Sequence, residues 1–207
     1  MSSSQAVSSL KPKNKGQKVM FDNPIIEKLT RTHIAVPISI FVGASIALAV
    51  YAFTYTDLPR LTIGLLFFAG LLAFTFVEYC MHRYLFHMST HTPKREKLQY
   101  NFHGVHHEYP KDKGRLAMPP IVSIVLASGI LGLFYLLMQE AAFAFFPGFI
   151  LGYAGYLFVH YIVHAYQPPK NFFRVLWVNH GIHHYKDQTK AYGVSSPLWD
   201  YVFGTLP

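Results

Sequence analysis

Residues 103–107 read HGVHH, and residues 180–184 repeat that pattern as HGIHH. A spaced pair of histidines precedes each motif, in HRYLFH at residues 82–87 and in HYIVH at residues 160–164. In both halves the second histidine of the pair lies 16 positions before the HxxHH motif, which a duplication or a shared geometric requirement would both explain. Ten of the 12 histidines fall in these motifs: His82, His87, His103, His106, His107, His160, His164, His180, His183 and His184.

Long apolar runs lead up to the histidine motifs. The first two cover residues 33–53 and 61–77, and the second is expected to continue as helix to residue 82 or beyond. The others cover residues 120–138 and 141–159, the last interrupted by Pro147-Gly148. Roughly 20 apolar residues cross a bilayer as a helix, so we expect an all-α integral membrane protein. It would have four transmembrane helices, as two hairpins, beneath a cytosolic histidine-rich helical cap. Length alone leaves open whether the second hairpin spans fully or dips in obliquely.

The distribution of charge supports this topology. The chain is 52% hydrophobic and 14% charged, which is too apolar for an average soluble domain. Of its 18 Lys and Arg residues, 17 lie in residues 1–32, 82–119 and 160–207, on one side of a four-span arrangement. The positive-inside rule places those segments, and hence both termini and all four motifs, in the cytosol. Topology thus explains the net charge of +8, and no nucleic-acid motif is visible.

The charge distribution and the apolar runs predict two parts of the chain: a basic cytosolic tail over residues 1–32 and a single membrane domain over residues 33–207. The tail is rich in Ser, Lys and Gln, as disordered segments and lipid-binding basic segments both are. A short interfacial helix is expected between Phe21 and Thr32. No apolar signal segment occurs in the tail, and multi-pass insertion in a bacterial inner membrane is favoured over the endoplasmic reticulum.

The histidine patterns predict metal binding. His160 and His164 are four residues apart, so a helix turns both rings to one side. An HxxHH motif on a helical turn similarly gathers three rings on one side. The five-residue spacing of His82 and His87 does not fit one helical face, so either the helix is distorted there or the two rings serve different positions in the site. So many clustered rings would repel one another if protonated, and metals bind them neutral. Ten donors predict two metal ions with about five ligands each, and imidazole suits iron, zinc, copper and nickel.

The remaining candidates lie near the motifs. His33 and His91 stand outside them and are expected to be structural hydrogen-bonding residues. Four acids are candidates to orient metal-binding rings from behind, with ordinary surface or capping roles as the alternative: Glu78, Asp112, Asp187 and Asp200. Arg115 is a candidate for binding a substrate head group, with a lipid-phosphate or structural role as the alternative.

The motifs in this order resemble the membrane fatty acid hydroxylase/sterol desaturase superfamily. The stretches HGVHHEYPKDKGRLAMPP, HYIVHAYQP and GVSSPLWDYVFGTLP resemble its fatty acid 2-hydroxylases, over residues 74–207. The resemblance implies a four-helix membrane part under a cytosolic domain, and the ten histidines as ligands of a dinuclear centre. Iron is expected for activity, with zinc as an alternative occupant. It also implies O2-dependent hydroxylation at C2 of a fatty acid or of the N-acyl chain of a ceramide-like lipid.

The sequence departs from that family in three places. Many relatives carry a cytochrome b5 domain with an HPGG motif, which this sequence lacks, so electrons are expected from a separate cytochrome b5, ferredoxin or similar protein. Tyr156-Leu157 stands where relatives often have YD, and His164-Ala165 where they often have HH. The alternatives are hydroxylation or desaturation of a sterol, carotenoid or other lipid. A non-enzymatic metal-binding membrane protein is a third.

Overall fold

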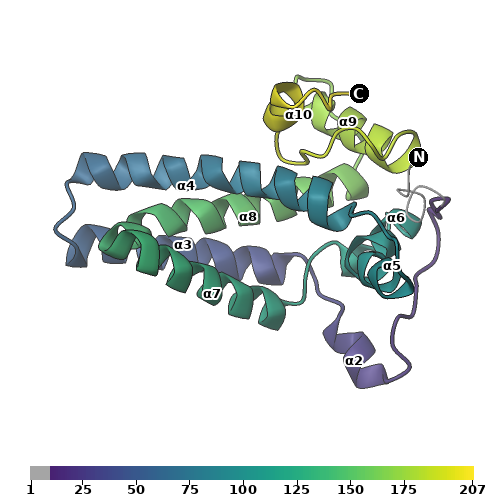
Figure 1. The fold of residues 1–207 in the computed structure, drawn as a ribbon, viewed down its shortest axis with the longest axis horizontal. Coiled ribbons are helices and arrows are strands. Elements are labelled where there is room, and N and C mark those ends of the chain that lie inside the picture. Colours follow the sequence, from purple (N-terminus) through teal and green to yellow (C-terminus); the bar gives the residue numbers. More distant parts are fainter. Residues whose placement is uncertain (1–9) are drawn as a thin grey trace.

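Four long apolar helices form the body of the molecule. The structure is a computed structural model that describes residues 10–207, and in these residues every regular element is a helix (Figure 1). The long helices run alongside one another, and the turns of both hairpins lie at the same end of the body. Their bounds closely follow the apolar runs of the sequence: α3 (Ala35–Tyr55), α4 (Arg60–Cys80), α7 (Pro120–Met138) and α8 (Ala142–Ala165).

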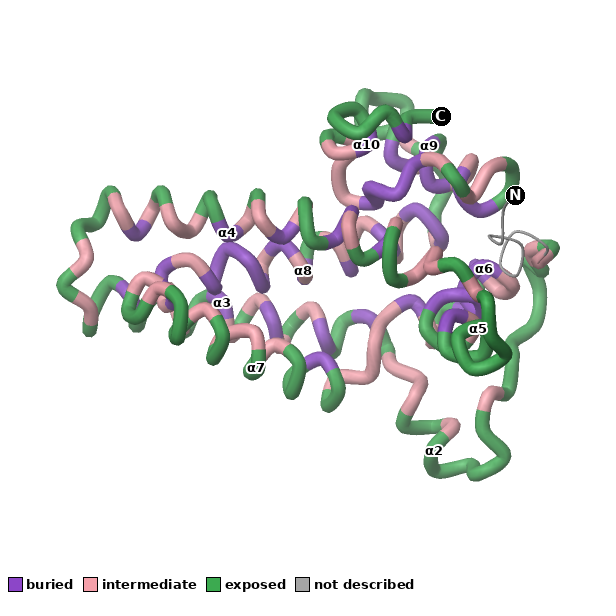
Figure 2. The backbone as a smooth tube through the Cα atoms, viewed as in Figure 1, coloured by how far each residue is buried: buried purple, intermediate pink, exposed green. Residues whose placement is uncertain are grey.

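The length and composition of these helices indicate a membrane protein. Three helical stretches are apolar and long enough to cross a bilayer, namely 35–55, 60–86 and 113–165. The third contains both α7 and α8, which a 3-10 turn at Gln139–Ala141 joins. The outer faces of the helices are exposed along their length (Figure 2), and they carry large apolar side chains such as Leu65 and Leu136. Such a surface suits lipid rather than water.

Helix α8 is the central helix of the body. It packs along α3 and α4 and, more lightly, against α7. The core between them includes Phe41 of α3, Phe74 of α4 and Phe149 of α8. The α4 and α8 backbones approach closely because Gly70 and Gly148 lie where they cross, and a Cβ on either would collide with a carbonyl oxygen of the other helix. This packing fixes the direction in which α4 and α8 deliver their histidines.

Pro147 does not interrupt α8, contrary to the expectation from sequence. The helix continues from Ala142 to Ala165 with Pro147 inside its second turn. A proline inside a helix removes one backbone N–H donor, and such a loss can be accommodated without ending the helix. The Ser45 hydroxyl of α3 also donates to the Pro147 carbonyl at 2.8 Å, which ties this part of α8 to its neighbour.

The cap lies at the end of the body opposite the hairpin turns (Figure 1). It consists of short helices that follow α4 and α8. After α4 and before α7 they are η1 (Met81–Phe86), α5 (Pro93–Gln99), η2 (Tyr100–Gly104), α6 (Val105–Glu108) and η3 (Lys113–Arg115). After α8 they are α9 (Arg174–Tyr185) and α10 (Leu198–Val202).

The N-terminal segment crosses the cap before it enters α3. The Lys13 backbone N–H donates to the Glu108 carbonyl at 2.7 Å, and the Tyr185 hydroxyl donates to Asn14 at 2.6 Å. The expected interfacial helix is present as α2, shorter than predicted at Pro24–Leu29, with the Asn23 side chain as its N-cap. Residues 1–9 of the expected tail lie outside the described residues. The remainder of the tail is therefore docked on the cap.

Candidate metal centre

The fold brings the ten motif histidines together in two groups of five. Within each group, one nitrogen from every ring lies within 4.8 Å of the others, and nine of the ten residues are buried. The first group contains His82, His87, His103, His107 and His183. The second group contains His106, His160, His164, His180 and His184. The groups adjoin, since the rings of His107 and His184 stack with their centroids 4.2 Å apart.

Each HxxHH motif divides its histidines between the two groups, so the expectation that it would gather three rings on one side is wrong. His103 and His107 belong to the first group, but His106 between them belongs to the second. His180 and His184 belong to the second group, and the intervening residue His183 belongs to the first. On an α-helix the i+4 side chain lies about 40° from the first, whereas the i+3 side chain lies about 60° to the opposite side. Each half of the chain therefore gives one histidine to the group built mainly by the other.

A π-helical turn resolves the five-residue spacing of the first pair. At its end, α4 widens into the π-helix η1, and the His87 N–H donates to the His82 carbonyl at 3.2 Å. This i to i+5 bond is the defining feature of a π turn. It brings side chains five residues apart onto one face, so both rings reach the first group. A second π turn, η2, contains His103 of the same group.

Three rings donate through Nδ1 to backbone carbonyls. His82 donates to Tyr192 at 2.5 Å, and His183 donates to Lys190 at 2.7 Å. His160 donates to Leu116 at 3.2 Å. A carbonyl can only accept, so Nδ1 carries the proton in each case. The Nε2 atom of a neutral ring then presents a lone pair to the interior of its group.

These lone pairs face other ring nitrogens at hydrogen-bonding distance. The Nε2 atoms of His82 and His103 lie 3.1 Å apart, and those of His183 and His87 lie 3.0 Å apart. In the second group the Nε2 atoms of His160 and His106 lie 2.9 Å apart. Neither nitrogen of His184 has a partner among the described residues. A cation at the centre of each group would take one nitrogen from each ring, so the donor set fits bound metal.

Burial keeps the rings neutral and able to act as ligands. It lowers the pKa of His183 to about 3, with a further contribution from the neighbouring His87. Burial also holds the pKa of His107 well below its ordinary value, and His183 adds to that effect. Protonated rings at these positions would repel one another in a medium that solvates charge poorly. The two groups could therefore hold metal ions at physiological pH.

Comparison with known proteins agrees with this geometry. The family model described as fatty acid hydroxylase matches residues 67–205. The chain belongs to the fatty acid hydroxylase family. The matched segment includes all ten histidines of the two groups.

Characterised proteins and a solved structure resemble this chain over most of its length. It is 38% identical over 189 residues to the dihydroceramide fatty acyl 2-hydroxylase FAH2 of Arabidopsis thaliana, covering 90% of this chain and 79% of that protein. It is 40% identical over 161 residues to the ceramide very long chain fatty acid hydroxylase scs7 of Schizosaccharomyces pombe, covering 75% of this chain but 46% of the other. The structure of full-length scs7p, in which only the hydroxylase domain is visible, superposes with a TM-score of 0.85 at 33% identity, covering 93% of this chain and 73% of that one.

Two of the four acid candidates in this hydroxylase-family chain hold a loop next to the two histidine groups. Glu78 accepts hydrogen bonds from the backbone N–H groups of Val194 and Ser195 at 2.7 and 2.9 Å. Asp200 accepts from those of Tyr192 and Gly193 at 2.8 and 2.7 Å. The loop that these two acids hold, residues 190–195, also supplies the Tyr192 and Lys190 carbonyls, which accept from His82 and His183. Glu78 and Asp200 therefore contact the loop whose carbonyls hold His82 and His183, and their role in orienting the rings stays a prediction.

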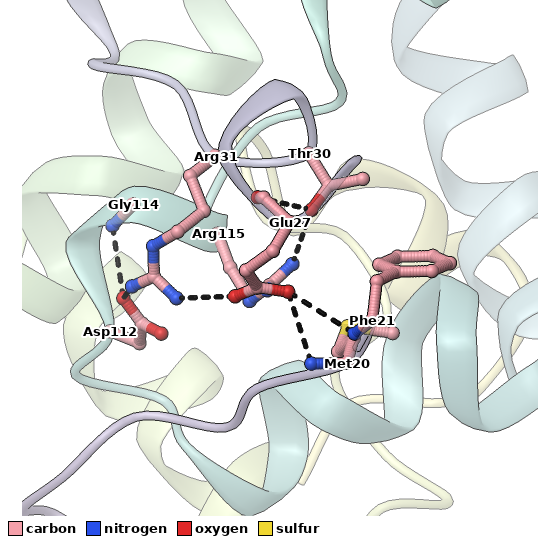
Figure 3. A network of polar contacts seen from close by, with 8 residues as sticks. All are labelled: Met20, Phe21, Glu27, Thr30, Arg31, Asp112, Gly114 and Arg115. Carbon is pink, nitrogen blue, oxygen red and sulfur yellow. Dashed lines mark hydrogen bonds and ion pairs between the residues drawn. The ribbon is translucent and has the colours of Figure 1, made fainter. Parts of the chain in front are cut away.

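The other two acids and Arg115 have partners away from the rings, and Figure 3 shows those of Asp112 and Arg115. Asp187 accepts from the backbone and hydroxyl of Thr189 at 2.9 and 2.6 Å, within its own turn. Asp112 accepts from Arg31 at 2.5 Å, and Arg115 donates to Glu27. Within residues 10–207 none of the four acids hydrogen-bonds to a histidine ring. The head-group role of Arg115 stays a prediction, although its side chain is only 7% exposed.

Sequence reasoning missed the groups that orient the rings, because they are backbone carbonyls. The loop carbonyls of Lys190 and Tyr192 flank Ala191, which has a positive φ of 55° that L-residues rarely adopt. No side-chain pattern marks such acceptors, and an alanine gives no sign of a left-handed conformation. His33 lies outside both groups, as expected, and its Nδ1 accepts from the Ala35 N–H at the start of α3. His91 also lies outside them.

Proposed function

We propose that this chain is a membrane fatty acid 2-hydroxylase. It would insert a hydroxyl group at C2 of a fatty acid or of the N-acyl chain of a ceramide-like lipid. The observation that carries the proposal is the pair of adjoining, buried, all-histidine groups at the end of an apolar helical body. The relatives in Arabidopsis thaliana and Schizosaccharomyces pombe, which are named for hydroxylation of dihydroceramide and ceramide acyl chains, support the choice of substrate.

The ten histidines would hold two metal ions, with iron expected in the active protein and zinc as an alternative occupant. Bound metal would supply the reductive activation of O2 that a C–H bond requires. One oxygen atom enters the C–H bond at C2, and the other leaves as water. This balance consumes two electrons and two protons, so the reaction needs a reducing partner. We assign that role to a separate cytochrome b5, ferredoxin or similar protein.

The chain's own residues would hold the donors and exclude water. Carbonyls behind His82, His160 and His183 fix the orientation of those rings, which then need not reorganise during turnover. Tyr156 stacks on the His160 ring at 13° and 5.4 Å between centroids, closing the side of the second group that faces the helical body. The acyl chain would lie along the apolar surface, with C2 at the two groups and its tail in the bilayer.

The same proposal includes the arrangement in the membrane. Helices α3, α4, α7 and α8 would form two spanning hairpins, so that residues 33–207 make one membrane domain and residues 1–32 a cytosolic segment. Support comes from the hairpin turns at one end and the basic cap at the other (Figure 1).

Labelling of single cysteines tests this topology. In a Cys80→Ala background, cysteines replacing Asp57 and Lys94 should react with an impermeant reagent from opposite faces of the membrane. Reaction of both from one face would refute this arrangement. The compartment, bacterial inner membrane or endoplasmic reticulum, stays a prediction.

Lipid analysis of an expressing host tests the reaction. Cells that express the chain with a reductase system should gain 2-hydroxy acyl species by mass spectrometry. The His106→Ala/His183→Ala double variant removes one donor from each group and should produce none. His33→Ala is the matched control, since this histidine lies outside both groups. Equal product from the double variant would refute the metal-centre reading. A lipid that loses two mass units, or a hydroxylated sterol or carotenoid, would reassign the reaction within the superfamily.

A further inference from the structure

The turn at residues 112–116, which contains η3, supplies the hydrogen-bond acceptor for His160 Nδ1. The Leu116 carbonyl accepts from His160 Nδ1 at 3.2 Å, and the Leu116 side chain is 3% exposed. His160 belongs to α8, whereas Leu116 lies in the connection between the cap and α7. Because the two segments belong to different parts of the fold, the orientation of the ring depends on what holds the turn at residues 112–116.

The N-terminal segment holds the end of that turn nearest to Leu116 (Figure 3). The Arg115 guanidinium donates to the Glu27 carboxylate and, at 3.2 Å, to the Thr30 hydroxyl. The Arg115 side chain is 7% exposed and that of Glu27 is 15% exposed, so water screens this ion pair little. The second Glu27 oxygen accepts from the backbone N–H groups of Met20 and Phe21 at 3.1 and 3.3 Å. Glu27 therefore joins the segment before α2 to the residue that precedes Leu116.

The same segment also holds the beginning of the turn. Arg31 donates to Asp112 at 2.5 Å, and the carboxylate oxygen that it contacts also accepts from the Gly114 N–H at 3.2 Å. The Thr32 N–H donates to the Gly114 carbonyl at 3.1 Å. The turn is thus attached at Asp112, Gly114 and Arg115 to residues 27–32. Asp112 and Arg115, chosen from the sequence as site residues, contribute here to the support of the Leu116 carbonyl.

We propose that Glu27 is a positioning residue for the second histidine group, acting through Arg115 and the Leu116 carbonyl on His160. The inference rests on the proposed metal centre. Removal of the Glu27 charge would leave the buried Arg115 guanidinium without its counter-ion, and the turn would have to move to solvate it. The Leu116 carbonyl would move with the turn, and His160 would lose the bond that presents its Nε2 to the group. The first group, whose carbonyl acceptors lie in the 190–192 loop, would be unaffected.

Zinc release tests this inference without a turnover assay. The full chain is purified in detergent, loaded with zinc, and mixed with a colorimetric chelator. Glu27→Gln keeps the side-chain shape but removes its charge, and should release one of the two ions about ten-fold faster than wild type. The other ion should leave at the wild-type rate. Lys13→Ala is the matched control. It breaks another ion pair of the same segment, Lys13 with Glu108 at 2.6 Å, which does not involve the 112–116 turn.

The other outcomes are separable. Release of both ions at wild-type rates from Glu27→Gln would overturn the inference, and equal acceleration of both would reduce Glu27 to a general structural role and overturn it too. If Glu27→Gln does not fold, Thr30→Val decides, because it keeps the Glu27 charge and removes the second acceptor of Arg115, together with the hydrogen bond that the Thr30 hydroxyl donates to the Glu27 carbonyl at 2.8 Å. It should accelerate one ion to a smaller degree, and unchanged release would refute the inference. A wild-type protein that binds no zinc would instead refute the metal centre itself.

Discussion

Asp200→Asn should release the metal of the first histidine group while the protein stays folded. The Asp200 side chain is fully buried and accepts three hydrogen bonds, from the Tyr192 and Gly193 N–H groups at 2.8 and 2.7 Å and from the Thr205 hydroxyl at 2.7 Å. An asparagine keeps one acceptor oxygen and turns an NH2 group towards a backbone donor. A hydrogen bond to a charged group contributes about 1.5–3 kcal/mol. With one such bond lost and the others weakened, the free energy of unfolding should fall by about 3 kcal/mol.

The metal content reports the more specific consequence. The loosened loop contains the carbonyls that accept from His82 and His183, and both rings belong to the first group. Loss of such supporting contacts typically lowers metal affinity about 10–100-fold. Dialysis against a weak chelator should therefore reduce the zinc-to-protein ratio from two to one. Asp187→Asn is the control, because Asp187 bonds only within its own turn to Thr189. Retention of both ions by Asp200→Asn would refute the argument that the loop orients these rings.

Three further outcomes are expected. His106→Ala should remove the second-group ion and keep the first, although His106 lies in the first HxxHH motif, and loss of the first ion instead would contradict the division between groups. Gly148→Ala should lower the free energy of unfolding by about 3 kcal/mol in denaturation experiments, because its Cβ would collide with the Phe67 carbonyl oxygen. Gly43→Ala, where a Cβ meets no described atom within 4 Å, should have little effect. In denaturation experiments on the metal-free protein, the free energy of unfolding should fall as pH drops below about 6.5, the ordinary pKa of histidine. Below that pH the unfolded chain binds protons on these rings and the folded protein does not. For His183 this loss continues down to its folded pKa of about 3, and a stability independent of pH between 7 and 5 would contradict the neutral, buried rings.

The sequence predicts the helical body well because the physical signals there are local. Pro120 and Met138, the expected ends of the third apolar run, are the observed ends of α7. A proline starts the run, and polar Gln139 and Glu140 end it, so both boundaries lie in the chain itself. The effect of Pro147 is not predictable from the local pattern, because a helix can pass through a proline when neighbouring helices hold it, as Ser45 of α3 does here.

The site is predictable in its donors and less so in its arrangement. Clustering identifies the ten histidines, and helix geometry separates the i+3 ring of each HxxHH motif from the other two, but which rings of different segments share a group depends on tertiary packing. The spacing of His82 and His87 indicates a distortion without specifying a π turn. Proximity in sequence points to Glu78 and Asp200, but their hydrogen bonds to Val194 and Tyr192 depend on the folded position of the 190–195 loop.

The exchange of His106 and His183 between the halves has a consequence for biogenesis. When a ribosome has made only the first half, four donors of the first group exist, and the fifth, His183, has yet to be synthesised. The second group likewise needs His106 from the half made earlier. Neither five-donor set can be completed until the second HxxHH motif has emerged and docked against the first. Metal insertion should therefore act as a late checkpoint that distinguishes assembled chains from nascent or truncated ones.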